Sequence, residues 1–524
     1  MAPAGIVWNS TTRMGTLDER NRSLWVAGTD GRTWPALAGA TDVDVAVVGA
    51  GITGLTTALL LADSGASVLV VEAGRVSSGV TGYTTAKVTS LHGLTYDRLR
   101  SQHGAEKAGA YGQANQAAVE LVAATVERLG IDCELTRAAA YTYTEDPAQV
   151  AEIEAEVEAA TQAGLPATFT TETDLPYPVA GAIRVDDQLH FDPRRYCLGL
   201  AEAVDAAGAT VAERTRVVDV RQGSPCVLRT EHGEVRAQRV VLATHLPFLD
   251  RGGFFARCHP ERSYALAARL DGPVPLGMYL SADSPTRSVR PARGGTVVVL
   301  GGEGHKVGQD PDTRRRYEAL EAWSRERFPV ADVDHRWSAQ DHVPADGLPF
   351  IGPLTPGNDR VFVATGFKKW GMTNGTVAAM VLSDRLRGEE SRWASTFDPG
   401  RFKPRAELRD LVKENANVAR RFVGDRLATT TKRRSGDDLA AGEGAVVTVG
   451  GKKAAAFRDD DGTLHAVSPV CRHLGCEVTF NTAERTWDCP CHGSRYDVDG
   501  RVIEGPATKD LDPVGTDAAE AAPS

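Results

Sequence analysis

Four side chains near the C-terminal end have the types and spacing of a metal centre. The stretch 471–496 reads CRHLGCEVTFNTAERTWDCPCHGSRY, in which Cys471-x-His473 and Cys489-x-x-His492 supply two thiolates and two imidazoles. Two thiolates on one iron and two neutral imidazoles on the other can hold a [2Fe–2S] cluster at a higher potential than four thiolates do. A mononuclear zinc site is the alternative for this donor set. Zinc, however, leaves the second cysteine pair of the stretch without a role.

This stretch resembles the Rieske family, in the CTHLGC and CPCHGS form of the cytochrome bc1 and b6f proteins, over roughly residues 437–515. The resemblance implies that the two cysteines and two histidines named above are the cluster ligands. It also implies that Cys476 and Cys491 form a disulfide, and that Ser494 and Tyr496 donate hydrogen bonds to cluster sulfur. Such donors stabilise the negative charge of the reduced cluster and raise its potential.

A dinucleotide-binding pattern lies near the start of the chain. Gly49, Gly51 and Gly54 form a GxGxxG sequence, and Glu72 follows the next apolar stretch. We expect a strand at 44–48, a helix at 55–64 and a second strand at 67–71. In this order the glycines allow a tight turn, close approach of a pyrophosphate, and close packing of helix on strand, while the acid accepts from ribose hydroxyls.

Later segments favour FAD over NAD. The Gly/Ser/Thr-rich loop at 73–87, the strand end at 239–245, and the sequences at 346–352 (DGLPFIG) and 361–375 together resemble the D-amino-acid oxidase superfamily, which includes sarcosine and glycine oxidases. No second GxGxxG occurs in a strand–helix–strand context, so a separate NAD(P)H domain is not expected. The resemblance implies these FAD-binding residues: Gly49, Gly51, Thr53, Gly54, Glu72, Ala73, Arg75, Thr81, Thr84, Thr85, Val217, Ala243, Thr244, Gly366, Gly371, Met372, Thr373 and Asn374.

The expected architecture has three folded parts: an α/β Rossmann-like FAD domain, an α+β mixed-sheet substrate domain, and a small all-β Rieske domain. We expect an N-terminal arm at 1–42, the oxidoreductase at 43–400, a basic helix and linker at 401–436, the Rieske domain at 437–515 and a disordered tail at 516–524. Within the oxidoreductase, the FAD-binding parts are predicted at about 43–100, 205–260 and 345–390, and the substrate domain at about 101–204 and 261–344.

Composition restricts the class of partner. The chain has 524 residues, a net charge of -10 and 42 % apolar residues, which suits several ordinary cores and argues against a nucleic-acid partner. The N-terminal sequence lacks the apolar core of a signal peptide, and no run approaches the length of a membrane span. We therefore expect a cytoplasmic protein, although a disulfide is unusual in that compartment.

Candidates for catalysis are less specific. Reduced flavin is stabilised by a cation near its ring, and Lys368 and Lys369 lie in the late glycine-rich segment; His342 precedes the DGLPFIG segment. Other residues considered for the ring or substrate environment are Tyr83, Lys87, His92, Gln340 and Trp370. Arg262, Arg269 and Arg287 are equal candidates for binding a substrate carboxylate, because a guanidinium can pair with it through two hydrogen bonds.

The whole chain resembles bacterial fusions of a D-amino-acid-oxidase-type FAD domain with a C-terminal Rieske domain. The resemblance implies an FAD-dependent oxidoreductase that oxidises a small substrate, at a C–N bond of an amine or amino acid, and passes electrons singly through the cluster to an external acceptor. Three alternatives stay open: a reductase that takes electrons from NAD(P)H and feeds an oxygenase, a flavin mono-oxygenase, and a redox-sensing binding protein.

Overall fold

The computed structural model describes residues 22–401 and 434–515. The first half of the predicted arm, almost all of the predicted basic helix and linker, and the predicted tail lie outside the described residues. The helices beyond those introduced with the sheets below are α1 (Leu24–Ala27), α3 (Tyr96–His103), α4 (Ala105–Leu129), α5 (Val150–Gln162), α7 (Phe254–Arg257), α10 (Ala394–Phe397), and the 3-10 turns η2 (Val80–Tyr83), η3 (Pro147–Gln149), η4 (Arg293–Gly295) and η5 (Gly436–Asp438).

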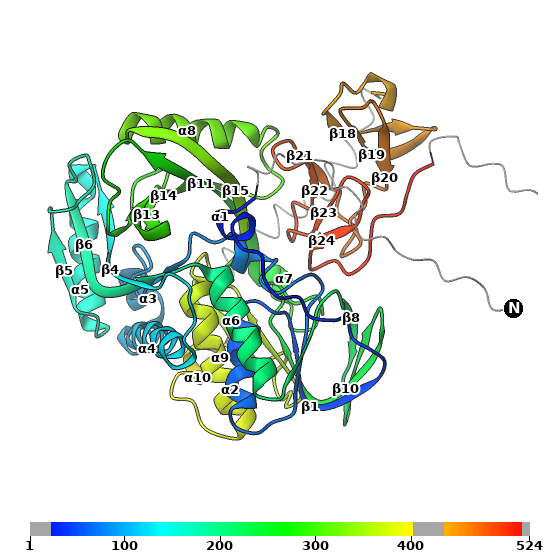
Figure 1. Ribbon diagram of the computed structural model, residues 1–524, viewed down its shortest axis with the longest axis horizontal. Helices are drawn as coiled ribbons and strands as arrows, with labels where there is room; N and C mark the ends of the chain where they lie inside the picture. The colour runs from blue at the N-terminus through cyan, green and yellow to red at the C-terminus, as the bar shows by residue number, and fades with distance from the viewer. Residues whose placement is uncertain (1–21, 402–433, 516–524) are drawn as a thin grey trace, which may run out of the picture.

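An eight-stranded sheet forms the dinucleotide-binding half. Its strands are β1 (Thr41–Val48), β2 (Val68–Val71), β7 (Thr210–Ala212), β8 (Val217–Arg221), β9 (Cys226–Thr230), β10 (Gly233–Leu242), β16 (Phe350–Pro353) and β17 (Val361–Thr365). The main order is β16-β17-β10-β1-β2-β7, with β8 and β9 branching from β10. The β2 strand, VLVV, is buried along its whole length. Helices α2 (Ile52–Ala62), α6 (Pro193–Ala206) and α9 (Gly371–Arg387) cover one face of the sheet, where Val68 and Val70 pack, whereas Leu69 and Val71 belong to a second core on the other face. These helices lie together below the centre of the molecule in Figure 1.

A nine-stranded mixed sheet forms the second half, as expected for the substrate domain. Its strands are β3 (Lys87–Val88), β4 (Thr136–Thr144), β5 (Ala167–Thr170), β6 (Gly181–His190), β11 (Cys258–Leu270), β12 (Met278–Ser281), β13 (Ser288–Ala292), β14 (Val297–Lys306) and β15 (Val330–Pro344). The order is β15-β11-β14-β13-β12-β4-β6-β3, and β5 pairs with β6. Residues along β11 alternate between two cores: Ala265 packs toward the dinucleotide half, while Tyr264 packs toward helix α8 (Arg314–Arg327).

Two small antiparallel sheets form the C-terminal domain, as predicted for an all-β module. One contains β18 (Gly444–Val449), β19 (Lys452–Arg458) and β20 (Leu464–Val467), and the other β21 (Thr479–Asn481), β22 (Thr486–Asp488), β23 (Arg495–Tyr496) and β24 (Val502–Glu504). In Figure 1 the four-stranded sheet lies closer to β15 and to the rest of the molecule than the three-stranded sheet does.

No helix in the described ranges is both long and apolar enough to cross a membrane.

Candidate redox sites

The dinucleotide turn between β1 and α2 depends on two glycines. Gly49 has φ +109°, and a Cβ there would lie 2.4 Å from the Ala243 carbonyl oxygen. At Gly54 a Cβ would lie 1.9 Å from the Gly49 carbonyl oxygen, so helix α2 can approach the turn only without a side chain. The close packing inferred from the sequence at Gly54 is therefore present.

A cavity of about 230 Å³ lies at this turn. The predicted FAD-binding residues that line it are Gly49, Gly51, Thr53, Glu72, Ala73, Thr81, Thr84, Val217, Ala243, Thr244, Gly371 and Met372. The Glu72 carboxylate stands at the end of β2 and accepts from the backbone N–H groups of Ala50 at 2.8 Å and Gly74 at 2.7 Å. Burial raises its pKa, and these backbone donors oppose the increase. A glycine cradle with a half-buried acid at the strand end fits the ribose and pyrophosphate of FAD.

The other predicted FAD residues lie outside this lining. Arg75 is exposed. Thr85 lies beside Gly301 of β14, in the nine-stranded sheet. Gly366, with φ +76°, turns the chain between β17 and α9. Thr373 donates to the Thr89 carbonyl at 3.2 Å, and the Asn374 amide donates to the Phe367 carbonyl at 3.3 Å. Thr373 and Asn374 are thus tied into the protein beneath the cavity.

The C-terminal domain supplies part of the cavity wall, which the sequence did not predict. The segment Ile503–Thr508, at the end of β24, lines the same cavity as the glycine turn. His245 and Asp341 line it as well. Nothing in the local sequence of 503–508 indicates this role, because the contact joins segments more than 200 residues apart. The sequence indicated for His245 only that it closes the predicted strand end at 239–245.

His245 links the two halves of the cavity wall. Its Nδ1 lies 3.0 Å from Glu504 Oε1, and its Nε2 lies 3.6 Å from Asp341 Oδ1, which is an ion-pair distance rather than a hydrogen bond. Burial lowers the pKa of His245, but the two carboxylates outweigh this and raise it to about 9. The docked arrangement therefore holds an imidazolium between one carboxylate from each domain.

This ion pair predicts a pH dependence of stability. Because the folded-state pKa is above the ordinary value of 6.5, the contribution is complete below about pH 6.5 and is lost as the pH rises through about 9. Replacing His245 with Asn, which tolerates the positive φ of 65° here, is expected to lower the melting temperature most at about pH 6.5 and least above about pH 9. Thermal unfolding of both proteins across this range tests it; a deficit independent of pH would contradict the ion-pair account.

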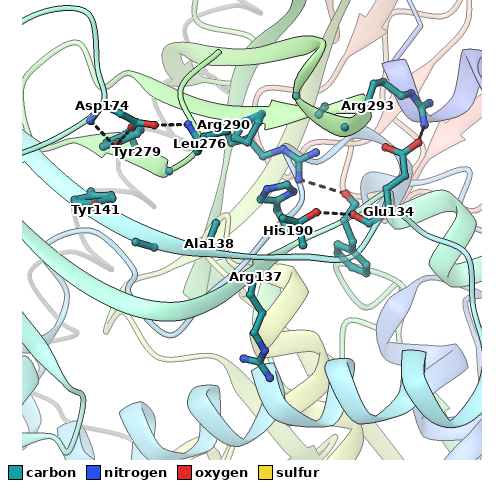
Figure 2. Close-up of a pocket in the computed structure, with 18 of the residues that line it drawn as sticks. Glu134, Arg137, Ala138, Tyr141, Asp174, His190, Leu276, Tyr279, Arg290 and Arg293 are labelled. Carbon is teal, nitrogen blue, oxygen red and sulfur yellow. Dashed lines mark hydrogen bonds and ion pairs between the residues drawn. The ribbon is translucent and has the colours of Figure 1, made fainter. Parts of the chain in front are cut away.

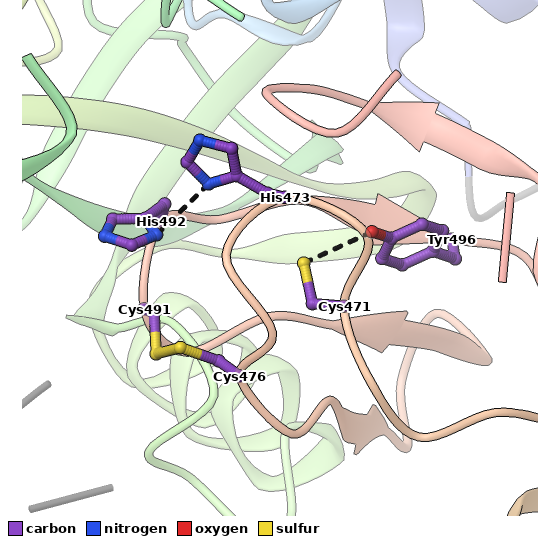
Figure 3. Close-up of a disulfide and its surroundings, with 6 residues drawn as sticks. All are labelled: Cys471, His473, Cys476, Cys491, His492 and Tyr496. Atoms are coloured by element: carbon purple, nitrogen blue, oxygen red, sulfur yellow. Dashed lines mark hydrogen bonds between the residues drawn. A yellow bond between two sulfur atoms is a disulfide. The ribbon is translucent and has the colours of Figure 1, made fainter. Parts of the chain in front are cut away.

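The predicted cluster ligands lie on two loops, and Figure 3 draws three of them, Cys471, His473 and His492. Nδ1 of His473 lies 3.2 Å from Nδ1 of His492, close to the separation of about 3.4 Å that two nitrogens at ~2.1 Å from one tetrahedral ion would have. Cys471 and Cys489 are buried free thiols. A hydrogen bond with Cys489 lowers the pKa of Cys471 to about 6 against the effect of burial. Two imidazoles with adjacent Nδ1 atoms and two neighbouring thiols fit a [2Fe–2S] cluster, in which two histidines would hold one iron and two cysteines the other.

Cys476 and Cys491 are joined by a disulfide between the two loops, with a Cα–Cα distance of 6.6 Å. Their sulfurs and that of Cys489 lie within 4.8 Å of one another. Since the two bridged sulfurs are not thiolates, Cys489 is the member of this trio that can bind iron.

Tyr496 and Ser494 lie where hydrogen bonds to sulfur were expected. The Tyr496 hydroxyl is 3.2 Å from Cys471 Sγ and also accepts from the Arg472 N–H at 3.1 Å. The Ser494 hydroxyl contributes to the lowered pKa of Cys471 and accepts from the Ala507 N–H at 3.0 Å.

Removing the Tyr496 hydroxyl should lower the cluster potential. The Tyr496→Phe variant loses a donor that stabilises the reduced state; a hydrogen bond of about 1 kcal/mol corresponds to a decrease of about 40 mV for one electron. A redox titration followed by EPR measures this. The Tyr264→Phe variant, whose hydroxyl contacts His305 instead, serves as control. An unchanged potential in Tyr496→Phe would contradict the assignment.

Residues of the oxidoreductase cover the histidine ligands. Asp250 Oδ1 accepts from His473 Nε2 at 2.7 Å, and the Phe255 ring packs edge-on against His473 and His492 at 6.0 and 5.3 Å. The side chain of His473 is only 4 % exposed as a result. A carboxylate behind a ligating imidazole fixes the ring and its tautomer. Neither Asp250 nor Phe255 was predicted, because no motif marks them.

A buried arginine on β11 also connects the domains. Arg262, 1 % exposed, lies 3.1 Å from Glu484 and 3.0 Å from Asp488 of the C-terminal domain. Gln340 on β15 donates to the Gly493 carbonyl at 2.8 Å, directly after His492. Arg262 and Gln340, which are candidates for substrate binding in the sequence, instead contact the C-terminal domain in the structure.

The remaining candidate arginines are also paired. Arg269 is exposed and contacts Asp332 and Asp334, both at 3.1 Å. Arg287 pairs with Glu303 at 2.8 Å. Both guanidinium groups are thus paired with carboxylates of the protein.

The three catalytic candidates have different environments. Lys369 lines the FAD cavity and pairs with Glu261 at 3.0 Å. Lys368 is half-buried, and its burial lowers its pKa to about 7, with Arg98 acting in the same direction. His342 is outside the cavity lining; its ring packs edge-on against His245 at 4.5 Å. Burial, followed by the charges of His245 and of the cluster ligand His492, holds the pKa of His342 well below its ordinary value.

The early-loop candidates lie inside the protein. Lys87 donates to the Tyr279 carbonyl at 2.6 Å and to Ser288, and burial lowers its pKa to about 7. His92 stacks on Trp370 at 4.4 Å, and burial lowers its pKa to about 3. The Tyr83 carbonyl accepts from the Trp337 indole at 2.9 Å.

Comparisons with known proteins agree with this geometry. Residues 44–385 match the family model "FAD dependent oxidoreductase", and residues 431–515 match "Rieske [2Fe-2S] domain". A Bacillus subtilis (strain 168) protein named "Putative Rieske 2Fe-2S iron-sulfur protein YhfW" is 38% identical over 503 residues, covering 95% of this chain and 98% of its own.

Other relatives match the oxidoreductase part. Gamma-glutamylputrescine oxidoreductase of Escherichia coli (strain K12) is 23% identical, over 67% of this chain and 85% of its own length. The crystal structure of glycine oxidase from Geobacillus kaustophilus has a TM-score of 0.59 at 20% identity, covering 69% of this chain and 100% of that one. At 20% identity, the similarity to the glycine oxidase structure shows that the two proteins share a fold. The chain belongs to the FAD dependent oxidoreductase family and carries a C-terminal Rieske [2Fe-2S] domain.

Proposed function

We propose that the protein oxidises a C–N bond of a small amine or amino acid and releases the electrons one at a time to an external acceptor. FAD, when bound, accepts a hydride equivalent, and the Rieske cluster exchanges single electrons. The residues proposed to hold FAD are those at the glycine turn and Glu72. Those proposed to hold the cluster are Cys471, His473, Cys489 and His492.

One observation supports the proposal most: Ile503–Thr508 of the cluster domain lines the cavity proposed for FAD. The same domain presents its ligand imidazoles to Asp250 and Phe255 of the oxidoreductase. An enzyme that gave its electrons only to O2 would need neither contact. A dehydrogenase with an internal outlet needs the two centres close together.

Residues near the cavity can assist the chemistry. Lys369 can supply positive charge to stabilise reduced flavin, although the Glu261 carboxylate, 3.0 Å from its Nζ, partly neutralises that charge. Lys368, with a pKa of about 7, can accept or release a proton at Nζ at neutral pH. His342 is buried against the His245 ring and helps to exclude water from the pair that His245 forms with Glu504.

The choice of a C–N bond is supported by the names of similar proteins. They include a gamma-glutamylputrescine oxidoreductase, a glycine oxidase and an L-proline dehydrogenase. Each of these names refers to a substrate that contains a C–N bond, which is the reason for proposing this substrate class here.

A substrate panel tests this proposal. The holoenzyme is mixed without oxygen with primary amines, N-methyl amines, amino acids and NAD(P)H, and loss of the flavin absorbance is recorded. We expect bleaching by at least one amine or amino-acid class, and slow or no bleaching by NAD(P)H. Fast bleaching by NAD(P)H alone would favour a reductase that feeds an oxygenase.

A further inference from the structure

A second cavity, of about 710 Å³, opens through the nine-stranded sheet. Strand β12 lies between β4 and β13, and its pairing with β4 begins at Met278, opposite Ala140. The residues of β4 before Ala140 and of β13 after Val289 have no β12 residue between them, and the cavity lies there, between Thr136 and Arg290. The lining of this cavity shares no residue with that of the FAD cavity.

A buried guanidinium lies at the inner end of this gap. Arg290 is 1 % exposed, its Nη1 donates to the carbonyls of Ala86 at 2.9 Å and Phe191 at 3.3 Å, and its face covers the Trp25 ring at 4.9 Å. Its Nε has no hydrogen-bond partner among the described residues. Burial lowers the pKa of Arg290 to about 9, and the charges of Asp192 and Glu134 oppose this effect. Because a buried donor without a partner is costly, the unused N–H of Arg290 favours a further acceptor.

His190 adds a second unused donor beside Arg290. Its Nε2 is buried and unpartnered within the described ranges. Burial, together with the Arg290 charge, lowers the pKa of His190 to about 3, so the imidazole is neutral and can donate from one nitrogen. In Figure 2 the His190 and Arg290 side chains lie next to each other, whereas Arg137 on the neighbouring strand points away from both.

The acids of this cavity are engaged or lie at its rim. Glu134 accepts from Arg293 at 2.9 Å, and Asp174 holds the Tyr279 hydroxyl and the Leu276 N–H. Glu172 is exposed. Glu134 also acts on Arg290 through its charge, but its ion pair is with Arg293.

The walls suit an organic body rather than a bare ion. Tyr141 and Tyr279 stack with ring centres 4.6 Å apart and both line the cavity. The cavity volume is in the range of small-molecule sites, which combine apolar walls with a few convergent polar groups. An arginine edge presents parallel N–H groups, which match a carboxylate.

We propose that this cavity binds a small aromatic or otherwise planar carboxylate, held by Arg290 and His190 with its body against Tyr141 and Tyr279. The site is independent of the function proposed above. It lies next to the flavin loop, because the Ala86 carbonyl that accepts from Arg290 follows Thr84, which lines the FAD cavity. A bound anion would therefore compete with the Ala86 carbonyl for the Arg290 guanidinium and could shift the segment that contains Thr84 and Ala86.

Binding of benzoate to the FAD-loaded protein tests the proposal, measured by calorimetry, with benzamide as the neutral analogue. We expect benzoate to bind and benzamide to bind at least about tenfold more weakly. Arg290→Met should weaken benzoate by about tenfold to a hundredfold, since a charge-assisted pair is lost. Arg137→Met is the matched control, because Arg137 lines the cavity but pairs with Glu120 at 3.0 Å.

A second variant separates this site from the FAD cavity and guards against misfolding of Arg290→Met. Ala138→Trp adds bulk at a half-buried strand position of this cavity alone and should also abolish benzoate binding. No benzoate binding by the wild type, equal binding of benzamide, or full binding by Ala138→Trp or Arg290→Met would each overturn the proposal.

Discussion

The Arg262→Met variant is expected to reduce its cluster about a hundredfold more slowly than the wild type while substrate still bleaches its flavin. Arg262 is the buried cation that holds Glu484 and Asp488 against β11. Removing one partner of a buried ion pair costs about 3 kcal/mol, and at about 1.4 kcal/mol per factor of ten this corresponds to roughly a hundredfold loss of the docked state. The measurement is anaerobic stopped-flow absorbance with freeze-quench EPR.

Arg269→Met provides a matched control on the same strand. Arg269 carries the same charge on β11 but is exposed and paired with Asp332, so its loss should change cluster reduction by less than about threefold. Arg495, which also contacts Asp488 at 3.3 Å, remains in both variants and keeps the C-terminal domain folded. Equal rates in Arg262→Met and wild type would mean that this contact does not set the docking.

Gly54→Ala is expected to yield protein almost free of FAD. A methyl group at position 54 would lie 1.9 Å from the Gly49 carbonyl oxygen, so helix α2 must move away from the turn that receives the pyrophosphate. The ratio of flavin absorbance to protein absorbance in the purified protein measures flavin content.

Gly109→Ala is the control for this change. Gly109 also lies in a helix, α4, but a Cβ there meets nothing within 4 Å, and Ala favours the helix. Its flavin content should equal that of the wild type. Normal flavin content in Gly54→Ala would show that the turn can adjust and that its spacing is not needed.

Local patterns predicted much of the fold. The GxGxxG turn between apolar strands, the long alanine-rich helix α4 and the paired Cys–His loops are specified by residues close together in sequence. Each has a physical requirement that only a few residue types meet, such as a positive φ at Gly49 or a thiol at Cys489. That is why sequence alone places them.

Contacts between distant segments were not predictable in this way. Arg262 and Gln340 sit in strands that also border the substrate domain, and their partners follow more than 150 residues later. A buried arginine looks like a substrate clamp until its carboxylate partners are known. The same holds for Asp250 and Phe255, whose role depends entirely on where the C-terminal domain docks.

Transfer of electrons from flavin to cluster within one molecule is tested most directly by the order and yield of two signals in one anaerobic experiment. The protein, loaded with FAD and cluster, is mixed with the best substrate from the panel, and the flavin absorbance and the Rieske EPR signal are followed together. We predict that flavin absorbance falls first and that the EPR signal of the reduced cluster then rises in the same molecules, independent of protein concentration. A cluster that stays oxidised while the flavin is fully reduced, or one reduced only at a rate proportional to protein concentration, would contradict this transfer.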